Sequence, residues 1–390
     1  MISSQKNTVG SQTPTSLKVA SLFSGCGGMD LGFEGDFDVL RKSVLDRKDI
    51  VKSKRSSMIR LPRTSFDTIF ACDVVKNLRE KKHAYGLKDS KGKYHVDVVT
   101  GGFPCNDFSV AGKRLGFESN KSHRGNKTIL DTDIDDPTAE NRGMLYYWMK
   151  EFISEVRPKV FYAENVKGLV SLGDAKRIIE HDFSSIGDSS YYVLPVKVLK
   201  AMEFGVPQTR ERVIFIGVDK TRLTPKIRKF LDLNGNLPPE FDLYPIETHG
   251  SERLSLVTAG EALNDLGEPE NSLDNSHQSY SRAKYMGKMQ GQSEVREDKP
   301  GPTIRAEHHG NIEFRRLSKS NGGNNPQGPE RRLSVRECAR IQTFPDDFRF
   351  VIPGKLSASD GYRAIGNAVP PLLAWRLADR LEQVWNDLFI

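Results

Sequence analysis

The sequence is poor in cysteine, and its few cysteines do not have the spacing of a metal site or of a disulfide framework. Cys26, Cys72, Cys105 and Cys338 are scattered over 390 residues, and no two of them form a C-x-x-C pair. Neither zinc binding nor a disulfide-stabilised secreted fold is therefore indicated. We expect a protein with no metal site that works in a reducing compartment.

Long hydrophobic runs are also lacking. No run of about 18 apolar residues, the length that crosses a bilayer, occurs anywhere in the chain. The amino-terminal segment MISSQKNTVGSQTPTS has no apolar core of the length found in signal peptides. We therefore expect a cytoplasmic protein without membrane association, whose residues 1–16 form a disordered leader because they have almost nothing to bury.

A strong charge of one sign is lacking too. Lys and Arg number 58 against 51 Asp and Glu, which gives a formal net charge of +7. This excess permits a nucleic-acid partner without the charge density of a histone-like protein. The hydrophobic content of 37% excludes disordered and collagen-like chains. The length suggests two or three domains, or one large domain with a long insertion.

Short apolar runs that end in glycine or a polar residue recur along the first 218 residues. They lie at residues 17–23, 67–72, 96–100, 159–163 and 213–218. Strands that alternate with helical patterns are typical of an α/β fold with a parallel, Rossmann-like sheet. Such a sheet places its site at the carboxyl ends of its strands. We predict a catalytic and cofactor-binding domain at residues 17–218.

The composition changes after residue 218. Residues 219–330 are rich in Pro, Gly, Asn and Ser and have few periodic segments, so we predict a smaller, loop-rich domain there. Ser334 and Glu337 then have the spacing of a helix capping box. The last segment places apolar residues on one helical face, which predicts that residues 331–390 return to the first domain: Leu373, Leu377, Leu381, Val384 and Leu388.

Two polar stretches look inserted. Residues 41–63 contain nine Lys or Arg and two Asp. We interpret them as a solvated face, the alternative being a contact with phosphates. Residues 119–140 are predicted to be a surface loop.

The first apolar run is followed by F-S-G-C-G-G at residues 23–28. Such glycines allow close approach of a nucleotide-like cofactor, or simply form a tight strand-to-helix turn. The motif is not the G-x-G-x-x-G of dinucleotide binding. The acid that ends the next strand, Asp73, lies 45 residues past Gly28, whereas about 20 are expected in an NAD-binding fold. A Rossmann dehydrogenase is therefore disfavoured.

Two further motifs carry reactive side chains at predicted strand ends. In G-G-F-P-C-N-D-F-S, Cys105 follows a proline and precedes a Gly, Ser and Lys loop, which can expose a thiol under a mobile cover. In A-E-N-V, Glu164 ends the strand at residues 159–163. A carboxylate there caps the next helix or hydrogen-bonds a ring nitrogen of a substrate.

The motif Q-T-R-E-R at residues 208–212 leads into the last of the predicted strands. Arg210 and Arg212 are two residues apart and project to the same side if this stretch is extended. Their guanidinium groups could hold Glu164, lower the pKa of the thiol or grip a phosphate. A surface ion pair is the alternative.

Taken together, the motifs are far more specific than any one of them. In this order, F-S-G-C-G-G, G-G-F-P-C, A-E-N-V, Q-T-R-E-R, R-R-L-S-V-R-E-C-A-R-I-Q-T-F-P and G-Y-R-A-I-G-N-A-V-P-P resemble the blocks of the cytosine-C5 DNA methyltransferase family. The resemblance spans Val19 to about Arg376. It implies an S-adenosylmethionine-dependent methyltransferase whose target-recognition region lies between the fourth and fifth blocks, where the composition changes.

The resemblance also implies the roles of the reactive residues. Cys105 is the nucleophile that adds to carbon 6 of cytosine, since carbon 5 is too poor a nucleophile to attack a methyl sulfonium unaided. Glu164 contacts the N3 and amino edge of the base. Arg212 orients Glu164 or the cytosine carbonyl, and Arg210 lies nearer the DNA or the cysteine. The target base leaves the helix, and the loop with Ser109, Gly112 and Lys113 covers it.

The cofactor site is likewise carried over by resemblance. Its implied residues are Phe23, Gly25, Cys26, Gly27, Gly28, Asp73, Gly102, Pro104, Asn367 and Ala368. Asp73 would take the ribose hydroxyls. The acid that contacts adenine in the family has no clear counterpart, with Asp89 and Asp97 as candidates. Cys338 sits at an apolar position of its helix and is expected to be inert.

The partner that follows from this interpretation is duplex DNA, bound by a monomer. A stand-alone enzyme of this size resembles the modification half of a bacterial restriction system, which implies a cognate restriction endonuclease. A tRNA cytosine-C5 methyltransferase of the same fold and a non-catalytic DNA-binding regulator are the alternatives. The bases of the recognition site cannot be decoded from residues 219–330.

Overall fold

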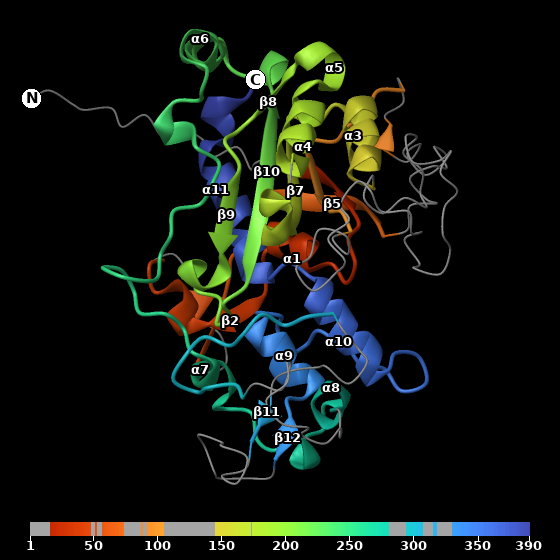
Figure 1. Ribbon diagram of the computed structural model, residues 1–390, viewed down its shortest axis with the longest axis vertical. Coiled ribbons are helices and arrows are strands. Elements are labelled where there is room, and N and C mark those ends of the chain that lie inside the picture. The colour runs from red at the N-terminus through yellow and green to blue at the C-terminus, as the bar shows by residue number, and fades with distance from the viewer. Residues whose placement is uncertain are drawn as a thin grey trace, which may run out of the picture.

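A computed structural model describes residues 16–47, 51–52, 57–73, 87–88, 92–104, 145–172, 174–280, 294–306, 315–317 and 330–390. A central sheet and its helices occupy the upper part of the molecule in Figure 1, and a smaller part built of short elements lies below it. No helix within these ranges is long and apolar enough to cross a membrane.

The central sheet has seven strands in the order β5-β1-β6-β7-β10-β8, with β9 also paired to β10. Their bounds are β1 (Leu17–Leu22), β5 (Phe66–Cys72), β6 (Val98–Gly102), β7 (Val160–Val166), β8 (Tyr191–Val193), β9 (Lys197–Lys200) and β10 (Glu211–Asp219). The neighbours from β5 to β7 are parallel, so the predicted α/β sheet is confirmed. All five predicted strands are present, with bounds that differ by at most three residues.

Strand β10 runs antiparallel to β7, β8 and β9, which departs from a purely parallel sheet. The reason is the connection that precedes it. Only residues 201–210 separate β9 from β10, and a parallel crossover needs a dozen or more residues. The mostly parallel sheet therefore ends in antiparallel strands.

Two hydrophobic clusters cover the two faces of the sheet. Successive residues of β10 alternate between them: Ile214 and Ile216 belong to one cluster, Val213 and Phe215 to the other. Helices α1 (Gly28–Glu34) and α11 (Pro371–Leu388) contribute to the first cluster, and α3 (Leu145–Val156) and α4 (Ala175–Ser184) to the second. The short α5 (Ile186–Ser189) follows α4.

The carboxyl-terminal helix docks on the sheet as its apolar face predicts. Its five predicted apolar residues are all buried: Leu373, Leu377, Leu381, Val384 and Leu388. A β-carbon at Gly32 of α1 would lie 2.4 Å from the β-carbon of Ala374. Helices α1 and α11 can therefore touch only because residue 32 has no side chain.

The lower part of the molecule surrounds a third hydrophobic cluster. Its elements are α7 (Ala259–Leu263), α8 (Asn275–Gln278), β11 (Arg315–Arg316), β12 (Arg331–Arg332), α9 (Val335–Ile341) and α10 (Ala358–Asn367). The predicted capping box at the start of α9 is present, with Ser334 and Glu337 bonding each other's backbone amides. Cys338 of α9 is fully buried in this cluster.

Packing divides the chain differently from the predicted domain boundaries. Helix α6 (Pro225–Asn234) and residues up to Tyr244 pack in the cluster of the sheet. Helices α9 and α10 pack instead with Ala259 and Ile304 of the predicted target-recognition region. Within the described residues, the return to the sheet is thus made by residues 369–389 rather than by all of 331–390.

The described part of the basic stretch at residues 41–63 contributes to a small sheet. Strands β2 (Asp38–Leu40), β4 (Met58–Arg60) and β3 (Val51–Lys52) pair in that order, after the 3-10 turn Arg41–Val44. Four of its cations form ion pairs within the protein, namely Lys42–Glu261, Arg47–Asp379, Arg60–Asp36 and Arg63–Asp67. In the described part of the stretch, these four cations bind carboxylates of the protein itself. Residues 119–140 lie outside the described ranges.

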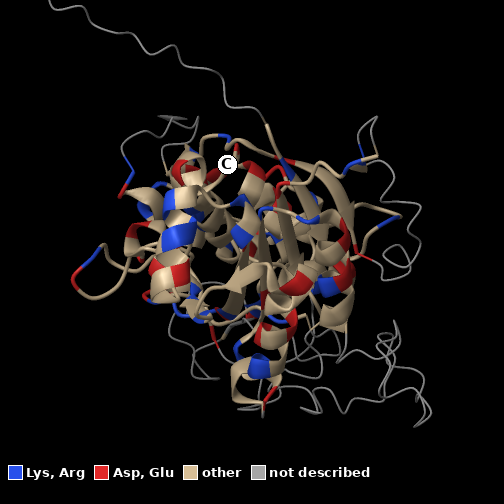
Figure 2. Ribbon diagram, turned by 90° about the horizontal axis from the view of Figure 1, so that it is seen from above, with Lys and Arg blue, Asp and Glu red and all other residues tan. Residues whose placement is uncertain are grey.

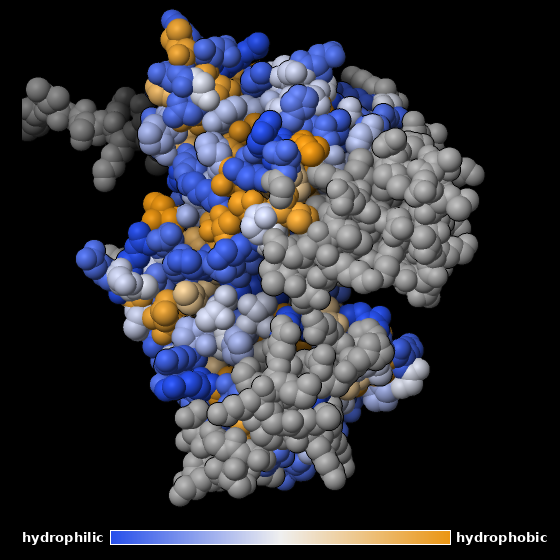
Figure 3. Space-filling view, in the orientation of Figure 1, coloured by the Kyte–Doolittle hydropathy of each residue, from blue (hydrophilic) through white to orange (hydrophobic). Residues whose placement is uncertain are grey.

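Charged and hydrophobic residues are both dispersed over the described surface. Lys and Arg alternate with Asp and Glu instead of forming one block (Figure 2). On the face seen in Figure 3 hydrophilic residues predominate, and hydrophobic ones gather in small patches. Neither view shows a single charged or hydrophobic patch that marks a binding site, so the candidate site is identified from the cavities instead.

Candidate active site

A cavity lined by described residues lies at the carboxyl ends of β1, β6 and β7. Its volume is about 640 Å³, within the range of small-molecule sites. Strands β5 and β6 lie on opposite sides of β1, so the cavity opens where the strand order reverses, the usual ligand position in such sheets. Predicted site residues that line it are Phe23, Gly25, Cys26, Gly28, Asp73, Gly102, Pro104, Glu164, Arg212, Asn367 and Ala368.

The turn after β1 is tightly wound. Phe23, Gly25 and Gly27 all have positive φ, at 53°, 55° and 80°. This conformation is costly for a bulky residue such as phenylalanine. The amide of Gly25 donates to Oδ1 of Asp73 over 3.2 Å. Asp73 therefore reaches the glycine turn despite the long stretch between them. Gly27 shapes the turn but does not line the cavity.

Gly28 and Ala368 bring two distant parts of the chain together. A β-carbon at Gly28 would lie 2.4 Å from the carbonyl oxygen of Val369 and 3.2 Å from the β-carbon of Ala368. The Ala368 carbonyl accepts a hydrogen bond of 2.7 Å from Gln342, next to α9. The carboxyl-terminal block thus forms one wall of the cavity, with Asn367 exposed to it.

Glu164 and Arg212 form an ion pair at the floor of the cavity. Nε of Arg212 lies 2.6 Å from Oε1 of Glu164, and both side chains are nearly buried. Their strands pair antiparallel, so the two ends meet. A β-carbon at Gly102 would lie 2.9 Å from Oε2 of Glu164. The glycine therefore leaves this second oxygen facing open space.

Asn165 is a functional candidate that the sequence analysis did not single out. Its Nδ2 donates to the carbonyl of Phe103 over 3.1 Å, and its Oδ1 accepts from the amide of Val166 over 2.8 Å. It is 1% exposed. Asn165 thereby holds the backbone just before Pro104 against β7. Its place beside Glu164 in A-E-N-V was the available signal.

Arg210 does not share the environment of Arg212, contrary to the expected common side. Its side chain is fully buried and donates to the carbonyls of Ile304 and Gly366, each over 2.9 Å. The strand begins only at Glu211, so the two-residue alternation does not extend to Arg210. In this position Arg210 joins the segment at residue 304 to α10 and does not face the cavity.

Cys105, the predicted nucleophile, lies outside the described residues, as do Ser109, Gly112, Lys113 and Asp89. Pro104 is the last described residue before it and lines the cavity. Asp97, the other candidate for adenine contact, accepts a hydrogen bond from the amide of Lys18 over 2.9 Å. Lys18 lies near the amino end of β1, so Asp97 is at the wrong edge of the sheet for that role.

The glycine turn is an acidic environment. Burial, together with the nearby Asp30 and Asp73, raises the pKa of the Cys26 thiol to about 12, so this thiol is neutral. Its Sγ donates to the carbonyl of Ala364 over 3.5 Å. Burial also raises the pKa of Asp30, in the first turn of α1, to about 6.

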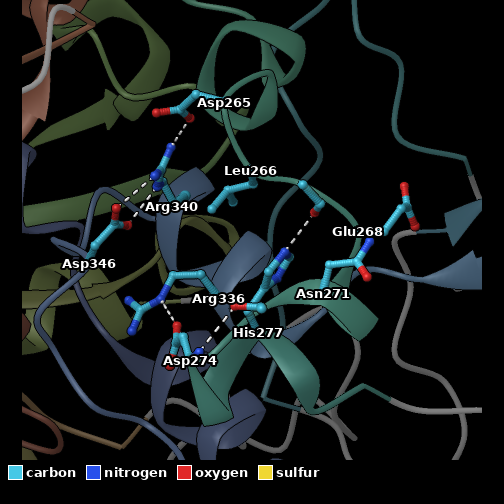
Figure 4. A pocket seen from close by; sticks show the side chains of 11 residues that line it. Asp265, Leu266, Glu268, Asn271, Asp274, His277, Arg336, Arg340 and Asp346 are labelled. Carbon is cyan, nitrogen blue, oxygen red and sulfur yellow. Dashed lines mark hydrogen bonds and ion pairs between the residues drawn. The ribbon is translucent and has the colours of Figure 1, made fainter.

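A second cavity of about 500 Å³ lies in the lower part of the molecule. Arg340 lies between Asp265 and Asp346, and Arg336 points to Asp274 (Figure 4). Its arginines already meet carboxylates, so these charges hold the surrounding segments together. The chemistry of the candidate site therefore belongs to the first cavity.

Comparison with known proteins shows a family match over most of the chain. The profile of the family "C-5 cytosine-specific DNA methylase" matches residues 17–126 and 134–383. Type II methyltransferase M.BsuRI of Bacillus subtilis is 33% identical over 400 residues, covering 93% of this chain and 78% of that protein. Type II methyltransferase M.BspRI of Lysinibacillus sphaericus is 32% identical over 394 residues, covering 95% and 82%.

Solved structures share the fold at low sequence identity. The Entamoeba histolytica methyltransferase EhMeth has a TM-score of 0.55 at 13% identity and covers 95% of this chain and 99% of its own. A putative DNA modification methyltransferase encoded in an Escherichia coli prophage has a TM-score of 0.52 at 19% identity, with coverage of 95% and 100%. These likenesses concern the fold alone.

Proposed function

Because this chain belongs to the C-5 cytosine-specific DNA methylase family, we propose that it methylates carbon 5 of a cytosine within a specific duplex DNA sequence. The observation that carries the proposal is the Glu164–Arg212 pair, which faces the same cavity as the glycine turn of residues 23–28. One cavity thus offers a base-binding carboxylate beside a nucleotide-like cofactor site.

The cavity fits S-adenosylmethionine as methyl donor. When bound, this cofactor supplies an electrophilic methyl group on a sulfonium. The glycines at positions 25, 27 and 28 would let the backbone of the turn approach it, and Asp73 would accept hydrogen bonds from ribose hydroxyls. Gly102, Pro104, Asn367 and Ala368 also line the cavity and would complete the site that holds the cofactor.

The protein's own residues activate the cytosine. The thiolate of Cys105 adds to carbon 6, and the electron pair of the 5,6 double bond becomes available at carbon 5. Glu164 holds the N3 edge of the ring through the oxygen that faces Gly102, while Arg212 fixes the other oxygen. Once carbon 5 carries the methyl group, it loses its proton, the carbon–sulfur bond breaks and the thiolate leaves.

Asn165 positions the nucleophile segment in this scheme. Its bond to the Phe103 carbonyl fixes the chain two residues before Cys105 relative to the strand that carries Glu164. The base has to leave the DNA helix to reach this place, since attack from above the ring is blocked in the stack. Unstacking costs a few kcal/mol, which contacts in the pocket offset.

The relatives favour DNA as the substrate. Proteins more than 30% identical to this chain over nearly its whole length are named type II methyltransferases. We infer that the chain is the modification enzyme of a restriction system and that a cognate endonuclease recognises the same sequence. The target-recognition region lies within residues 219–330.

A covalent trap tests the proposal. Bisulfite sequencing of plasmid DNA from an expressing host first gives the methylated sequence. A duplex with 5-fluorocytosine at that position, incubated with S-adenosylmethionine, is then expected to form an adduct at Cys105, because fluorine cannot leave as the carbon-5 proton does. Methylation without an adduct would contradict the mechanism. Methyl transfer to tRNA alone would overturn the DNA assignment, and no transfer at all would favour a regulator.

A further inference from the structure

The basic stretch noted in the sequence lies on an excursion of the chain between α1 and β5. The amide of Asp36 donates to the carbonyl of Pro62 over 3.3 Å, and that of Leu61 to the carbonyl of Phe37 over 2.9 Å. Strands β2 and β4 pair antiparallel next to these contacts. The excursion therefore begins and ends at one place. We call its described residues the insert: 36–47, 51–52 and 57–63.

The insert is anchored to the upper part of the molecule. Four of its aliphatic side chains are buried in the first cluster of the sheet: Val39, Val44, Ile59 and Leu61. Arg376 of α11 donates to both carboxylate oxygens of Asp46, over 2.6 and 2.7 Å. Arg47 pairs with Asp379 of the same helix. Apolar burial and ion pairs therefore fix the insert against the sheet and α11.

The insert also contacts the lower part of the molecule. Nζ of Lys42 lies 2.5 Å from Oε1 of Glu261 in α7. Oγ of Ser57 donates to Oδ2 of Asp265 over 3.4 Å, and Asp265 also binds Arg340 of α9. In Figure 1, β2 of the insert lies just above α7. The insert is thus joined to both parts of the molecule, and two acids of residues 219–330 receive it.

The contact between Lys42 and Glu261 joins two positions that are themselves fixed. Glu261 completes the capping box of α7, because its Oε2 accepts from the amide of Thr258 over 2.9 Å. The carbonyl oxygen of Lys42 lies 3.1 Å from Nε2 of His249, which is buried. A movement of α7 away from the insert would therefore break this ion pair.

The orientation of the lower part matters for the proposed reaction. Glu164 lies on β7 of the sheet, whereas α7, within the proposed target-recognition region, packs in the third cluster. DNA is stiff over the length of one recognition site. A duplex can therefore contact the recognition region and present its cytosine to Glu164 only when the two parts are correctly oriented.

We propose that Lys42 and Glu261 are positioning residues, and that the insert is a brace that sets the orientation of the target-recognition region relative to the sheet. This inference rests on the proposed function. Near the first cavity, Gln208 donates to Gln342 over 2.5 Å, and Gln342 donates to the carbonyl of Ala368 in the cavity wall. Helix α7 lies across the lower part from α10 (Figure 1). A contact at α7 therefore restricts rotation about the junction near the cavity.

Steady-state methylation by the purified full chain tests the brace, with the duplex identified by bisulfite sequencing as substrate. The side chains of Lys42 and Glu261 are 31% and 38% exposed, so their pair has a modest strength. Lys42→Met is expected to raise the KM for the duplex about threefold. The kcat should stay unchanged, because bound DNA itself holds both parts. Lys42→Arg should restore the wild-type KM.

Glu261→Gln separates the brace from a direct contact of Lys42 with DNA. The glutamine keeps an oxygen for the amide of Thr258 but loses the charge. Removal of an acid weakens the repulsion of phosphates, so a lost phosphate contact does not explain a higher KM in this variant. We expect the same threefold rise, at about the size found for Lys42→Met. The double variant should be no worse than either single one.

Arg63→Met is the matched control. It removes a cation of the same insert whose partner, Asp67, lies on β5 and not in the lower part. This variant is expected to keep the wild-type KM.

The inference is overturned if Lys42→Met leaves the KM unchanged, or if it raises the KM while Glu261→Gln does not, since Lys42 would then bind DNA directly. A rise of about ninefold in the double variant, the product of two independent losses, would also overturn it. So would an equal rise in Arg63→Met. Absence of DNA methylation by the wild type would instead contradict the proposed function.

Discussion

Two cavities formed by the described residues contain the same kinds of side chain but use them differently. In the lower cavity, Arg340 is buried between the carboxylates of Asp265 and Asp346, and Arg336 is buried with one carboxylate, that of Asp274, and two backbone carbonyls. In the upper cavity, the backbone of the glycine turn and the strand ends form much of the wall, and one oxygen of Glu164 faces open space. Arginines whose charge is balanced by carboxylates of other segments hold those segments together. The Glu164–Arg212 pair, which lines the upper cavity, can instead bind a substrate.

The largest effect on activity is expected from removing the thiol of Cys105. Cys105→Ala is expected to reduce methyl transfer by at least about a thousandfold, because the covalent route through carbon 6 disappears. Transfer of a labelled methyl group to plasmid DNA gives the rate. The melting temperature and the affinity for S-adenosylhomocysteine should stay at wild-type values. Unchanged methylation by this variant would show that another residue is the nucleophile.

The next largest effect is expected from the ion pair in the upper cavity. Glu164→Gln should lower kcat by a factor on the order of several hundred, the cost of removing a preorganised partner of the reacting ring. Stability should change little. Glu211→Gln is the matched control, because Glu211 forms an exposed ion pair with Lys167 next to Arg212. Equal losses in the two variants would mean that surface charge, not position, decides the rate.

Removing an arginine of the lower cavity should lower the stability of the protein, whereas the substitutions in the upper cavity should lower its activity. Arg340→Met leaves Asp346 and Asp265 without their buried partner, which we expect to cost about 3 kcal/mol of unfolding free energy. Urea unfolding followed by circular dichroism measures it. Lys197→Met, which removes the exposed pair with Asp242, should cost under about 1 kcal/mol. If the two variants lose the same amount of unfolding free energy, the buried ion pairs of Arg340 do not stabilise the fold more than an exposed pair does.

The smallest effect concerns pH. Burial lowers the pKa of His249 below the ordinary 6.5; the hydrogen bond to the Lys42 carbonyl and the charge of Asp46 oppose this shift, and the charges of Arg376 and Lys42 add to it. The unfolded chain therefore takes up this proton first, and the contribution of His249 to stability is lost as the pH falls through and below 6.5. His249→Gln should flatten the dependence of unfolding free energy on pH in that range. A slope unchanged by the substitution would rule out this group.

The strands and the terminal helix were predictable because their signals are local. Short apolar runs that end in glycine mark β1, β5, β6, β7 and β10, and a single apolar stripe marks α11. The direction of β10 was not predictable from its own residues. It depends on the short connection from β9, which the periodicity of β10 does not encode.

Most of the site could be predicted as residue types but not as an arrangement. The sequence gives Glu164, Arg212, Asp73 and the glycine turn as motifs, and the structure brings them to one cavity. Two arginines at alternate positions looked equivalent, yet Arg210 precedes the strand and is buried against Ile304 and Gly366. Partners that lie more than 90 residues away in the chain decide that difference.

By itself, the sequence determined the sheet, the amphipathic terminal helix and the family, since each rests on a pattern along the chain. Only the tertiary structure decided which charges are neutralised and which face open space. Arg212 and Arg340 both have mostly buried side chains, but Arg212 lines the upper cavity and pairs with one glutamate, whereas Arg340 meets two aspartates. Charge is a property of a residue, whereas neutralisation depends on the counter-charges that folding brings within a few ångströms.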